Sequence, residues 1–269
     1  MRTKYLKLKE TLSSFKKVLV AYSGGVDSTY LLYAAREILG EKNVLAVIAQ
    51  SPTYPVEEVE AAIKVADALD VECRLIETKE FDDENFLCNS TDRCFYCKKE
   101  LFSRLKMLAD EKGIEHIVDG SNYDDRADYR PGSRAKKELG VRSPLQEVGL
   151  TKTEIRDLSK EAGLPTWDKP SMACLSSRIP YGTRIDEGIL KMVGEGEKYL
   201  RSLGLKQLRV RHHNNIARIE VDQHSLPKIM EGDVMDGIVK KFEDLGYVYV
   251  TLDLKGYRSG SMNEGFHGK

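Results

Sequence analysis

Between Lys17 and Leu39 the chain reads Val18-Leu19-Val20-Ala21, then Tyr22-Ser23-Gly24-Gly25-Val26-Asp27-Ser28-Thr29, then an amphipathic segment. The apolar run predicts a buried parallel strand, and the polar run after it predicts a sharp turn into the amino terminus of a helix. The two glycines carry no Cβ atom, so a ligand can approach the backbone closely and a positive φ is permitted. The hydroxyl groups stand beside backbone N–H groups at the positive end of a helix dipole. The stretch therefore predicts an anion-binding loop.

This loop matches neither the Gly-x-x-x-x-Gly-Lys-Ser/Thr pattern of the Walker loop nor the Gly-x-Gly-x-x-Gly pattern of dinucleotide-binding proteins. A Gly-Gly pair followed by Asp-Ser is also an ordinary turn with a helix N-cap. The strand before it and the helix after it are, however, the context that a phosphate-binding motif requires. The pattern Ser-Gly-Gly-x-Asp-Ser resembles the pyrophosphate-loop ATPases, which split ATP into AMP and pyrophosphate. The resemblance implies adenylation with ATP and Mg²⁺ bound near Ala21, Ser23, Gly24, Gly25, Asp27 and Ser28, the last two acting in catalysis.

The composition is that of a globular chain without a global attraction to nucleic acid. The chain has 269 residues, 41% apolar and 32% charged, which is enough for one large or two medium domains. Its 42 Lys and Arg residues against 43 Asp and Glu residues disfavour a general RNA-binding protein without excluding a local basic groove. Residues 1–7 are charged and no apolar run reaches membrane-spanning length, so we expect a cytoplasmic protein with no membrane partner. The odd number of cysteines, five, indicates metal or sulfur chemistry before disulfides.

The first part of the chain alternates strands with helices. After a leading helix over 4–14 we expect strands at 18–21, 44–49, 71–76 and 114–119, with helices that include 55–69 and 97–112. This alternation predicts an α/β domain over residues 1–165, with a parallel sheet covered by helices on both faces. The resemblance to pyrophosphate-loop ATPases implies that this domain is adenine nucleotide alpha-hydrolase-like. Ligands then bind at the carboxyl ends of the strands. We therefore expect Gly120 to help bind the nucleotide, and Asp125 either to hold Mg²⁺ or to cap a helix.

The second part of the chain has a different pattern. Thr151-Lys152-Thr153-Glu154 has the sequence of a capping box that opens a helix ending near Gly163. Residues 166–185 are irregular and predict a link between domains. A helix at 186–203, strands at 208–213 and 217–221, a helix at 234–245 and a strand at 248–254 predict a small α+β domain over 186–255. We expect the tail, residues 256–269, to be flexible.

Three cysteines form a second group of candidate residues. Cys94-Phe95-Tyr96-Cys97 lies at a helix entrance, and this pair alone is compatible with a redox couple, half a zinc site or an incidental pairing. Cys174 has polar and arginine-rich neighbours, although a buried filler is the alternative. Three thiolates would fill three corners of a four-iron cluster and leave one iron open, whereas structural zinc normally takes four protein ligands. Cys73 is expected in the core, and Cys88 stays unassigned.

Arginines supply the candidate contacts to a second anion. Arg178 and Arg184 follow Cys174 closely, and a guanidinium group can bind a phosphate through two parallel hydrogen bonds. Arg209 and Arg211 alternate onto one face of a predicted strand, as do Arg218 and Glu220 in the next. These four side chains predict either cross-strand salt bridges on a solvated sheet face or contacts to an anionic substrate.

Taken together, these motifs resemble the LarE family of ATP-dependent sulfur transferases, which help to build the nickel-pincer nucleotide cofactor of lactate racemase. The resemblance covers nearly the whole chain and rests on residues 23–28, 92–102, 120–125, 128–132 and 174–182. It implies that a carboxylate of a pyridinium dicarboxylate mononucleotide is adenylated. A sulfur atom then attacks the acyl-adenylate, and AMP leaves as a thiocarboxylate forms.

The resemblance also implies site residues and partners. In the family, the cysteine matching Cys174 can be the sulfur donor and end as dehydroalanine, whereas members with cysteines matching Cys94 and Cys97 carry a 4Fe-4S cluster. Because this chain has all three, we predict the cluster type, with Cys174 also acting in catalysis and with sulfide or a sulfur-donor protein as a partner. The resemblance further implies a homo-oligomer and a second anion site in the stretch that contains Arg209, Arg211 and Glu220.

Three other functions compete with this one. A tRNA-thiolating enzyme of the pyrophosphate-loop class would share adenylation and the Cys-x-x-Cys pair, but the near-neutral charge argues against RNA as a partner. An ammonia-using AMP-forming synthetase would need no thiols. A non-catalytic nucleotide sensor would bind ATP without releasing pyrophosphate.

Overall fold

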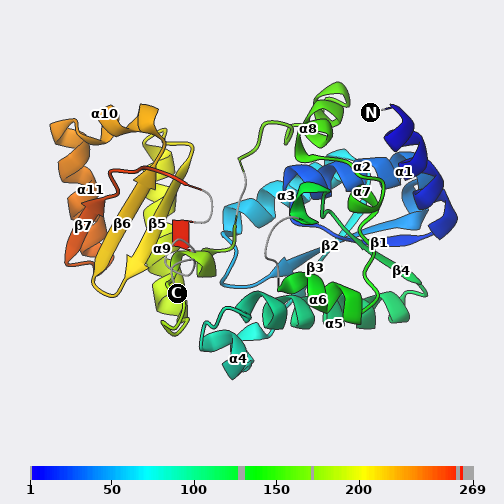
Figure 1. The fold of residues 1–269 in the computed structure, drawn as a ribbon, viewed down its shortest axis with the longest axis horizontal. Coiled ribbons are helices and arrows are strands. Elements are labelled where there is room, and N and C mark those ends of the chain that lie inside the picture. The colour runs from blue at the N-terminus through cyan, green and yellow to red at the C-terminus, as the bar shows by residue number, and fades with distance from the viewer. Residues whose placement is uncertain (1, 127–130, 171–172, 259–260, 263–269) are drawn as a thin grey trace. The chain divides into compact units, whose positions relative to one another are not determined.

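The computed structural model describes residues 2–126, 131–170, 173–258 and 261–262 (Figure 1). The chain forms two compact units, the first made of Met1–Phe86 and Thr91–Met172 and the second of Leu87–Ser90 and Ala173–Lys269. Residues 166–170, predicted as part of a link between domains, group with the first unit, and residues 173–185 group with the second. Residues 128–130, part of a motif quoted above, and residues 171–172, part of the predicted link, lie outside the described residues.

The first unit contains the predicted parallel sheet, which is confirmed. Its strands are β1 (Val18–Ala21), β2 (Val44–Gln50), β3 (Glu72–Glu77) and β4 (His116–Asp119). They lie in the order β3-β2-β1-β4, and every neighbouring pair is parallel. Val18 pairs with Val44 on one side and with His116 on the other, so β1 is an interior strand. The loops that follow β1 and β4 therefore leave the same edge of the sheet next to each other.

Helices cover both faces of this sheet (Figure 1). Side chains alternate along β1, so that Val18 and Val20 join one apolar core and Leu19 joins the other. The helices that contribute to the first core include α1 (Arg2–Phe15), α2 (Val26–Leu39), α3 (Val56–Ala68), α7 (Pro144–Glu147) and α8 (Lys152–Glu161). Those that contribute to the second are α5 (Arg93–Glu111) and α6 (Gly132–Glu138). None of the helices among the described residues has the length and apolar character needed to cross a membrane.

The helix α5 begins four residues earlier than the sequence predicts. We expected its start at Cys97, but Arg93 is its first residue, so Cys94 and Cys97 both lie inside the first two turns. The unit also contains short elements that the sequence pattern did not predict. They are α4 (Glu84–Leu87), α6, α7 and the 3-10 turns η1 (Glu41–Asn43), η2 (Glu80–Asp82) and η3 (Asp124–Arg126).

The predicted capping box at the start of α8 is present. The Thr151 side chain accepts a hydrogen bond from the backbone N–H of Glu154, and the Glu154 carboxylate accepts one from the backbone N–H of Thr151. Lys4 Nζ on α1 lies 2.7 Å from Glu154 Oε2. Hydrogen bonds from Lys4 and then from Thr151 lower the pKa of Glu154. The same carboxylate therefore caps α8 and ties the first helix to it, which fixes the position of Lys152.

The second unit is a small α+β arrangement, as predicted. Its strands are β5 (Leu208–His213), β6 (Ile216–Val221) and β7 (Tyr249–Leu252), with β5 antiparallel to β6 and β6 parallel to β7. Its helices and turns are η4 (Leu175–Arg178), α9 (Glu187–Ser202), η5 (Gln223–Ser225), α10 (Leu226–Ile229) and α11 (Gly232–Asp244). Phe242 of α11 comes so close to Gly196 of α9 that a Cβ there would lie 3.0 Å from the ring.

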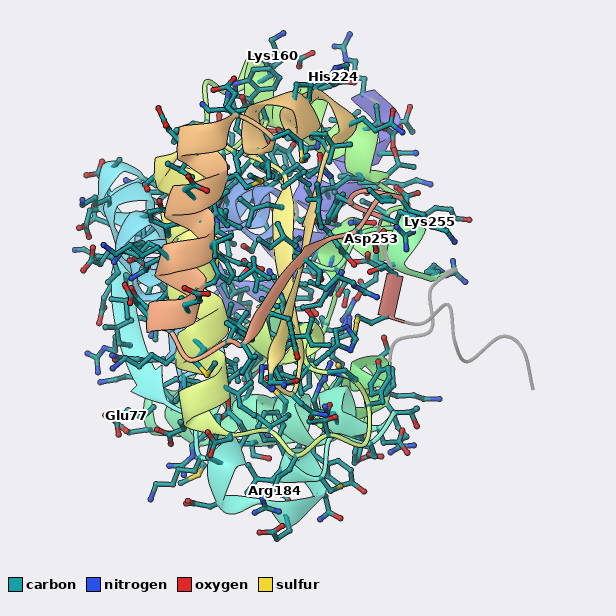
Figure 2. The ribbon with its side chains drawn as sticks, turned by 90° about the vertical axis from the view of Figure 1, so that its left-hand side faces the viewer. Glu77, Lys160, Arg184, His224, Asp253 and Lys255 are labelled. Atoms are coloured by element: carbon teal, nitrogen blue, oxygen red, sulfur yellow. The ribbon has the colours of Figure 1, made fainter. Side chains whose placement is uncertain are left out.

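The described residues that follow β7 pack against the second unit, and the flexibility expected of the tail stays a prediction. Tyr257 donates its backbone N–H to Val221 O at 2.8 Å, and Ser261 is buried. Gly256 adopts a φ of 68°, which turns the chain back over the sheet just after Asp253 and Lys255 (Figure 2). Residues 259–260 and 263–269, which the prediction also covered, lie outside the described residues.

The core beneath α5 makes a simple test of this packing. Leu105 is fully buried against the sheet, whereas Met107 on the same helix is 68% exposed. Leu105→Ala should lower the free energy of unfolding by about 3 kcal/mol, because it removes buried methyl groups and leaves a cavity. Met107→Ala should change it by less than about 0.5 kcal/mol. Urea unfolding of both variants measures the difference, and equal effects would contradict this placement of α5.

Candidate functional site

The loop between β1 and α2 has the geometry of an anion cradle. Tyr22 donates its backbone N–H to Val47 O at 2.9 Å, which holds the loop at the end of the sheet. Ser23 Oγ and Ser28 Oγ lie 3.0 Å apart, and Ser28 Oγ also donates to Gly25 O at 3.2 Å. Gly25 is the N-cap of α2 and provides no side-chain cap. The positive end of α2 is therefore left to a ligand or to solvent.

Two glycines are required by close packing around this loop. Gly24 has a φ of 67°, and a Cβ there would lie 2.5 Å from Ala62 Cβ of α3. A Cβ on Gly120, in the loop after β4, would lie 2.7 Å from Ser28 N. Gly25 has a φ of -80°, so the freedom to adopt a positive φ is needed at Gly24 and not at Gly25. The loop after β1 therefore packs closely against α3 on one side and the loop after β4 on the other.

Asp27 presents one free carboxylate oxygen at the start of α2. Its Oδ2 accepts hydrogen bonds from Lys152 Nζ at 2.7 Å and from Asn122 Nδ2 at 3.4 Å. Its Oδ1 is buried and has no hydrogen-bond partner among the described residues. An unpaired buried carboxylate oxygen is costly unless a ligand completes it, and Mg²⁺ prefers oxygen ligands of this kind. Asp27 therefore fits the role of a magnesium ligand.

Two lysines approach the loop from different sides, and the sequence reasoning missed both. Lys152 reaches Asp27 from the first residue of α8. Lys169 Nζ donates to Gly24 O at 3.0 Å and pairs with Glu58 Oε2 on α3 at 2.7 Å. The capping box predicts that Lys152 is the first residue of a helix. Only the fold shows that this end of α8 faces the loop after β1. Nothing in the irregular segment around Lys169 indicated its partner.

Asp125 is the middle residue of the 3-10 turn η3, and its side chain hydrogen-bonds back to Asn122, whose own side chain caps the turn. Its Oδ2 accepts a hydrogen bond from Asn122 N at 3.0 Å, and Asn122 Oδ1 accepts from the backbone N–H groups of Asp124 and Asp125. Asn122 in turn contacts Asp27, so this turn supports the loop after β1. The role of Asp125 as a metal ligand stays a prediction.

The Cys94 and Cys97 thiols lie in a positively charged setting at the start of α5. Both cysteines are reduced and partly buried. Arg93 Nη2 lies 4.0 Å from Cys94 Sγ, and the Arg134 guanidinium stacks 3.8 Å above the Phe95 ring. Two cysteines with Cys-x-x-Cys spacing can bring both sulfur atoms onto one metal ion. The environment of this pair is therefore compatible with metal binding.

The remaining cysteines occupy different settings. Cys73 packs against the core of the first unit, as predicted, and burial raises its pKa to about 11. Cys88 is exposed. Cys174 belongs to the second unit, where it precedes η4, while Cys94 and Cys97 belong to the first. Within the described residues no group of three or more His, Cys, Asp or Glu side chains is gathered for a metal ion. The iron-sulfur cluster stays a prediction.

Arg178 lies in the interior of the second unit. Its Nε and Nη2 donate to the two carboxylate oxygens of Glu197 at 2.8 and 3.1 Å, and neither side chain is exposed. Its Nη1 donates to the carbonyl oxygens of Ala173 and Cys174 at 2.7 and 3.0 Å. In this structure Arg178 therefore holds the Cys174 backbone against α9. A phosphate contact from Arg178, or from the exposed Arg184, stays a prediction.

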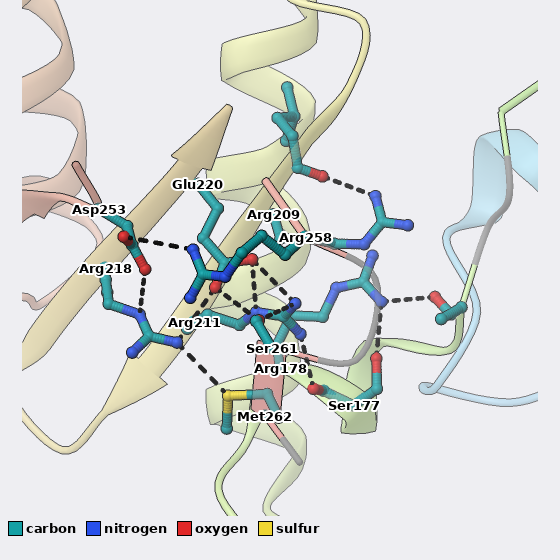
Figure 3. Close-up of polar contacts among 12 residues, drawn as sticks. Ser177, Arg178, Arg209, Arg211, Arg218, Glu220, Asp253, Arg258, Ser261 and Met262 are labelled. Carbon is teal, nitrogen blue, oxygen red and sulfur yellow. Dashed lines mark hydrogen bonds and ion pairs between the residues drawn. The ribbon is translucent and has the colours of Figure 1, made fainter. Parts of the chain in front are cut away.

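The predicted cross-strand ion pair is present between Arg211 of β5 and Glu220 of β6, but most of this face of the sheet is buried. Arg211 Nη2 lies 2.9 Å from Glu220 Oε2, and Arg218 Nη2 lies 3.1 Å from Glu220 Oε1 (Figure 3). Arg209, Arg211 and Glu220 are all buried. The prediction of a wet face was wrong because the chain after β7 covers these residues, which the strand pattern alone does not reveal.

Positive charge outnumbers negative charge in this arginine cluster. Within the described part of the unit, three carboxylates face six arginines, namely Glu197, Glu220 and Asp253 against Arg178, Arg201, Arg209, Arg211, Arg218 and Arg258. Burial, followed by the charge of Arg178, lowers the pKa of Arg209 to about 10. Such an excess of cations, of which Arg178, Arg209 and Arg211 are buried, favours binding of an anion.

Comparison with known proteins separates the two units. The profile of the NAD synthase family matches residues 1–110. An NH(3)-dependent NAD(+) synthetase of Pyrococcus horikoshii is 29% identical over 55% of this chain and 57% of its own length. The pyridinium-3,5-bisthiocarboxylic acid mononucleotide synthase of Lactiplantibacillus plantarum, a LarE protein, is 41% identical over 98% of this chain and 95% of its own length. The chain belongs to the LarE family.

Membership in the LarE family confirms the resemblance that the sequence motifs indicated. An uncharacterised protein of Synechocystis is 42% identical over 98% of both chains, so the similarity extends through both units in more than one relative. The match to NAD synthase is confined to the part that carries the loop after β1. This LarE-family chain thus combines an α/β domain of the ATP-using, pyrophosphate-loop class with a second unit that the NAD synthase profile does not reach.

Lys152 gives a test of the nucleotide site. Lys152→Met should weaken ATP binding by roughly 10- to 100-fold, because it removes a charge-assisted hydrogen bond to the phosphates or to their metal site. Lys160, an exposed lysine of the same helix, is the matched control, and Lys160→Met should bind ATP as the wild type does. Calorimetric titration with ATP and Mg²⁺ measures both, and equal affinities would contradict the assignment.

Glu197 gives a test by pH. Burial would raise the pKa of Glu197, but Arg178 and then Arg201 hold it below its ordinary value. The ion pair therefore stabilises the fold fully above the unfolded pKa of about 4.3, and this stabilisation is lost as pH falls through the folded pKa. Glu197→Gln should lower the free energy of unfolding by about 3 kcal/mol at neutral pH, because Arg178 stays buried without its partner.

The loss should shrink as pH falls from the unfolded pKa of about 4.3 through the lower folded pKa, because the wild-type carboxylate itself then becomes protonated. Urea unfolding at neutral and acid pH measures it. Glu187→Gln, at an exposed position in the first turn of the same helix, is the control and should differ little from the wild type at either pH. A constant difference across the pH range would show that the ion pair is not the cause.

Proposed function

We propose that this protein is an ATP-dependent sulfur transferase of nickel-pincer cofactor biosynthesis. It adenylates a carboxylate of a pyridinium dicarboxylate mononucleotide, releases pyrophosphate and then forms a thiocarboxylate. The observation that carries the proposal is the 41% identity to the Lactiplantibacillus plantarum synthase over 98% of the chain. The loop after β1, with the unpaired Asp27 oxygen beside it, supplies the chemistry that such a reaction needs.

The adenylation step follows from the residues around this loop. The backbone of Gly24 and Gly25, the hydroxyl groups of Ser23 and Ser28 and the amino terminus of α2 hold the β and γ phosphates of ATP. A substrate carboxylate oxygen attacks the α-phosphorus, and the bond to pyrophosphate breaks. Mg²⁺ on Asp27 would neutralise the charge that develops on the departing pyrophosphate. Lys152 adds positive charge at the same place.

The arginine cluster is proposed to bind the phosphate of the mononucleotide. Arg209 and Arg211 are buried side chains whose charge Glu220 balances only in part. Guanidinium groups bind phosphate through pairs of parallel hydrogen bonds. A negatively charged substrate would therefore be favoured over a neutral one.

For the sulfur step we propose the cluster type of enzyme. Cys94, Cys97 and Cys174 would each give a thiolate to a 4Fe-4S cluster, which leaves one iron without a protein ligand and so able to carry a sulfide. Sulfide or a sulfur-donor protein would replenish it. In the alternative route the Cys174 thiolate attacks the acyl-adenylate and AMP leaves. Loss of the Cys174 α-proton and cleavage of its Cβ–S bond then give the thiocarboxylate and dehydroalanine.

A second candidate is an ammonia-using AMP-forming synthetase, which the match of residues 1–110 to NAD synthase favours. Such an enzyme needs acyl-adenylate formation and a nitrogen nucleophile but no thiol. It would therefore keep its full activity without Cys174. The expected cytoplasmic location and homo-oligomeric assembly stay predictions for either candidate.

Cys174→Ala separates the two candidates. The variant should still release pyrophosphate from ATP when the pyridinium mononucleotide is present, because the loop after β1 is intact, but it should form no thiocarboxylate. Cys88→Ala, at an exposed cysteine, is the matched control and should form product at the wild-type rate. Mass spectrometry of the product measures this. An amide formed from ammonia by Cys174→Ala would instead identify a synthetase.

Iron and sulfide analysis after anaerobic purification separates the two sulfur routes. The cluster route predicts iron and sulfide in the wild type and their loss in Cys94→Ala. The sacrificial route predicts no iron, with Cys174 lighter by one hydrogen sulfide after turnover. The second result would overturn the cluster.

A further inference from the structure

The chain after β7 contacts all three strand arginines of the cluster, and Figure 3 shows its contacts with Arg211 and Arg218. We call its described residues, 256–258 with 261–262, the C-terminal clasp. The sequence pattern assigned these residues no role. In the second unit they lie against Arg209, Arg211 and Arg218, and Arg258 itself joins the cluster.

Ser261 makes the central contact of the clasp. It is 7% exposed, and its hydroxyl accepts a hydrogen bond from Arg211 Nη2 at 2.9 Å and donates one to Glu220 Oε1 at 2.8 Å. Arg211 Nη2 also reaches Glu220 Oε2 at 2.9 Å. Three groups thus close a ring of hydrogen bonds in which the hydroxyl bridges the guanidinium and the carboxylate. This ring fixes the direction of both charged groups.

The other clasp residues hold the flanking arginines. The Arg209 guanidinium lies 5.1 Å from the centre of the Tyr257 ring, within the range of a cation–π contact. Arg218 Nη2 donates to Met262 Sδ at 3.7 Å. Arg258 Nη1 lies 3.5 Å from Asp253, the carboxylate that also faces Arg218 Nε at 3.7 Å.

Gly256 is what allows the clasp to reach the cluster. Its φ is 68°, and a Cβ there would lie 2.8 Å from the carbonyl oxygen of Val221, the last residue of β6. Tyr257 N donates to that same oxygen at 2.8 Å. A side chain at position 256 would therefore strain the backbone and push the clasp away from the sheet.

We propose that the C-terminal clasp is a positioning element of the anion site, and that Ser261 sets how much of the Arg211 charge is available to a phosphate. The inference rests on the proposed function, which places the mononucleotide phosphate at this cluster. Glu220 Oε1 accepts hydrogen bonds from Arg218 and Ser261, and its Oε2 accepts one from Arg211. Without the hydroxyl, Glu220 loses the donor that it has on Oε1 beside Arg218 and pairs more closely with Arg211, whose charge it then neutralises more completely. The cluster then binds an added anion less tightly.

Ser261→Ala and Ser261→Thr form the first test. The probe is inorganic phosphate, titrated into the full chain with the nucleotide loop filled by a non-hydrolysable ATP analogue. The alanine variant should bind phosphate about tenfold more weakly, equivalent to about 1.4 kcal/mol. The threonine variant, which keeps the hydroxyl, should bind as the wild type does. In turnover the KM for the mononucleotide should rise with the same variant, while the KM for ATP stays unchanged.

Gly256→Ala and Gly232→Ala form the second test. Both add one methyl group in the second unit, but nothing lies within 4 Å of a Cβ at Gly232. Gly256→Ala should weaken phosphate binding, and Gly232→Ala should not. Lys255→Ala, at an exposed lysine beside the clasp, controls for the loss of nearby charge. Circular dichroism shows that each variant is folded.

The inference is overturned if the wild type binds no phosphate in this titration, if Ser261→Ala binds as tightly as the wild type, or if Ser261→Thr is as weak as the alanine variant. These outcomes are distinct from a failure of the proposed function. If the wild type forms no thiocarboxylate but the clasp variants weaken phosphate binding, the clasp stands and the sulfur-transfer function does not.

Discussion

The first unit depends on the pairing of β1 with a strand on each side. Because β2 and β4 flank it, the loops after β1 and β4 meet at one edge, where Gly120 comes so close to Ser28 that no side chain fits between them. The connections from β1 lead toward β2 and β3 on one side, and the chain returns to β4 on the other. Open α/β sheets bind ligands at such a reversal of strand order. Asn122 donates a hydrogen bond to Asp27 across this point. The conformation of the loop after β1 therefore depends on the strand order of the sheet as well as on its own residues.

The second unit depends on buried charge. Glu197 and Glu220 are fully buried, and each accepts hydrogen bonds from two arginines. Removing these groups from water is costly, and a buried ion pair commonly contributes little net stability. The arrangement makes more sense as one that serves binding, because the cations outnumber the carboxylates and an anion would restore the balance. Arg178 connects this cluster to the Cys174 backbone, so Cys174 and the buried arginines belong to one hydrogen-bonded network.

The sequence was sufficient where local chemistry decides the structure. The apolar strands, the capping box at Thr151 and the α+β pattern of the second unit were all predicted from residue types and spacing, and the family followed from its motifs. It was insufficient where a distant partner decides. Lys152 and Lys169 contact the loop after β1, although each lies more than a hundred residues further along the chain. The glycine-rich sequence after β7 predicts mobility, but Ser261 hydrogen-bonds to Glu220, which lies 41 positions earlier on β6.

The order of the strands also has a consequence for how the chain is made. The strand β1 leaves the ribosome early, yet its neighbour β4 follows only at His116, and the Lys4 side chain must wait for Glu154. Until then, one edge of a very apolar strand has no partner and could pair with another nascent chain. Such long separations slow folding because the loop must close before the contacts form. Early packing of the amino-terminal helices and pairing with β2 would leave the β4 edge of β1 open. Synthesis at low temperature or with a chaperone should therefore increase the yield of native protein.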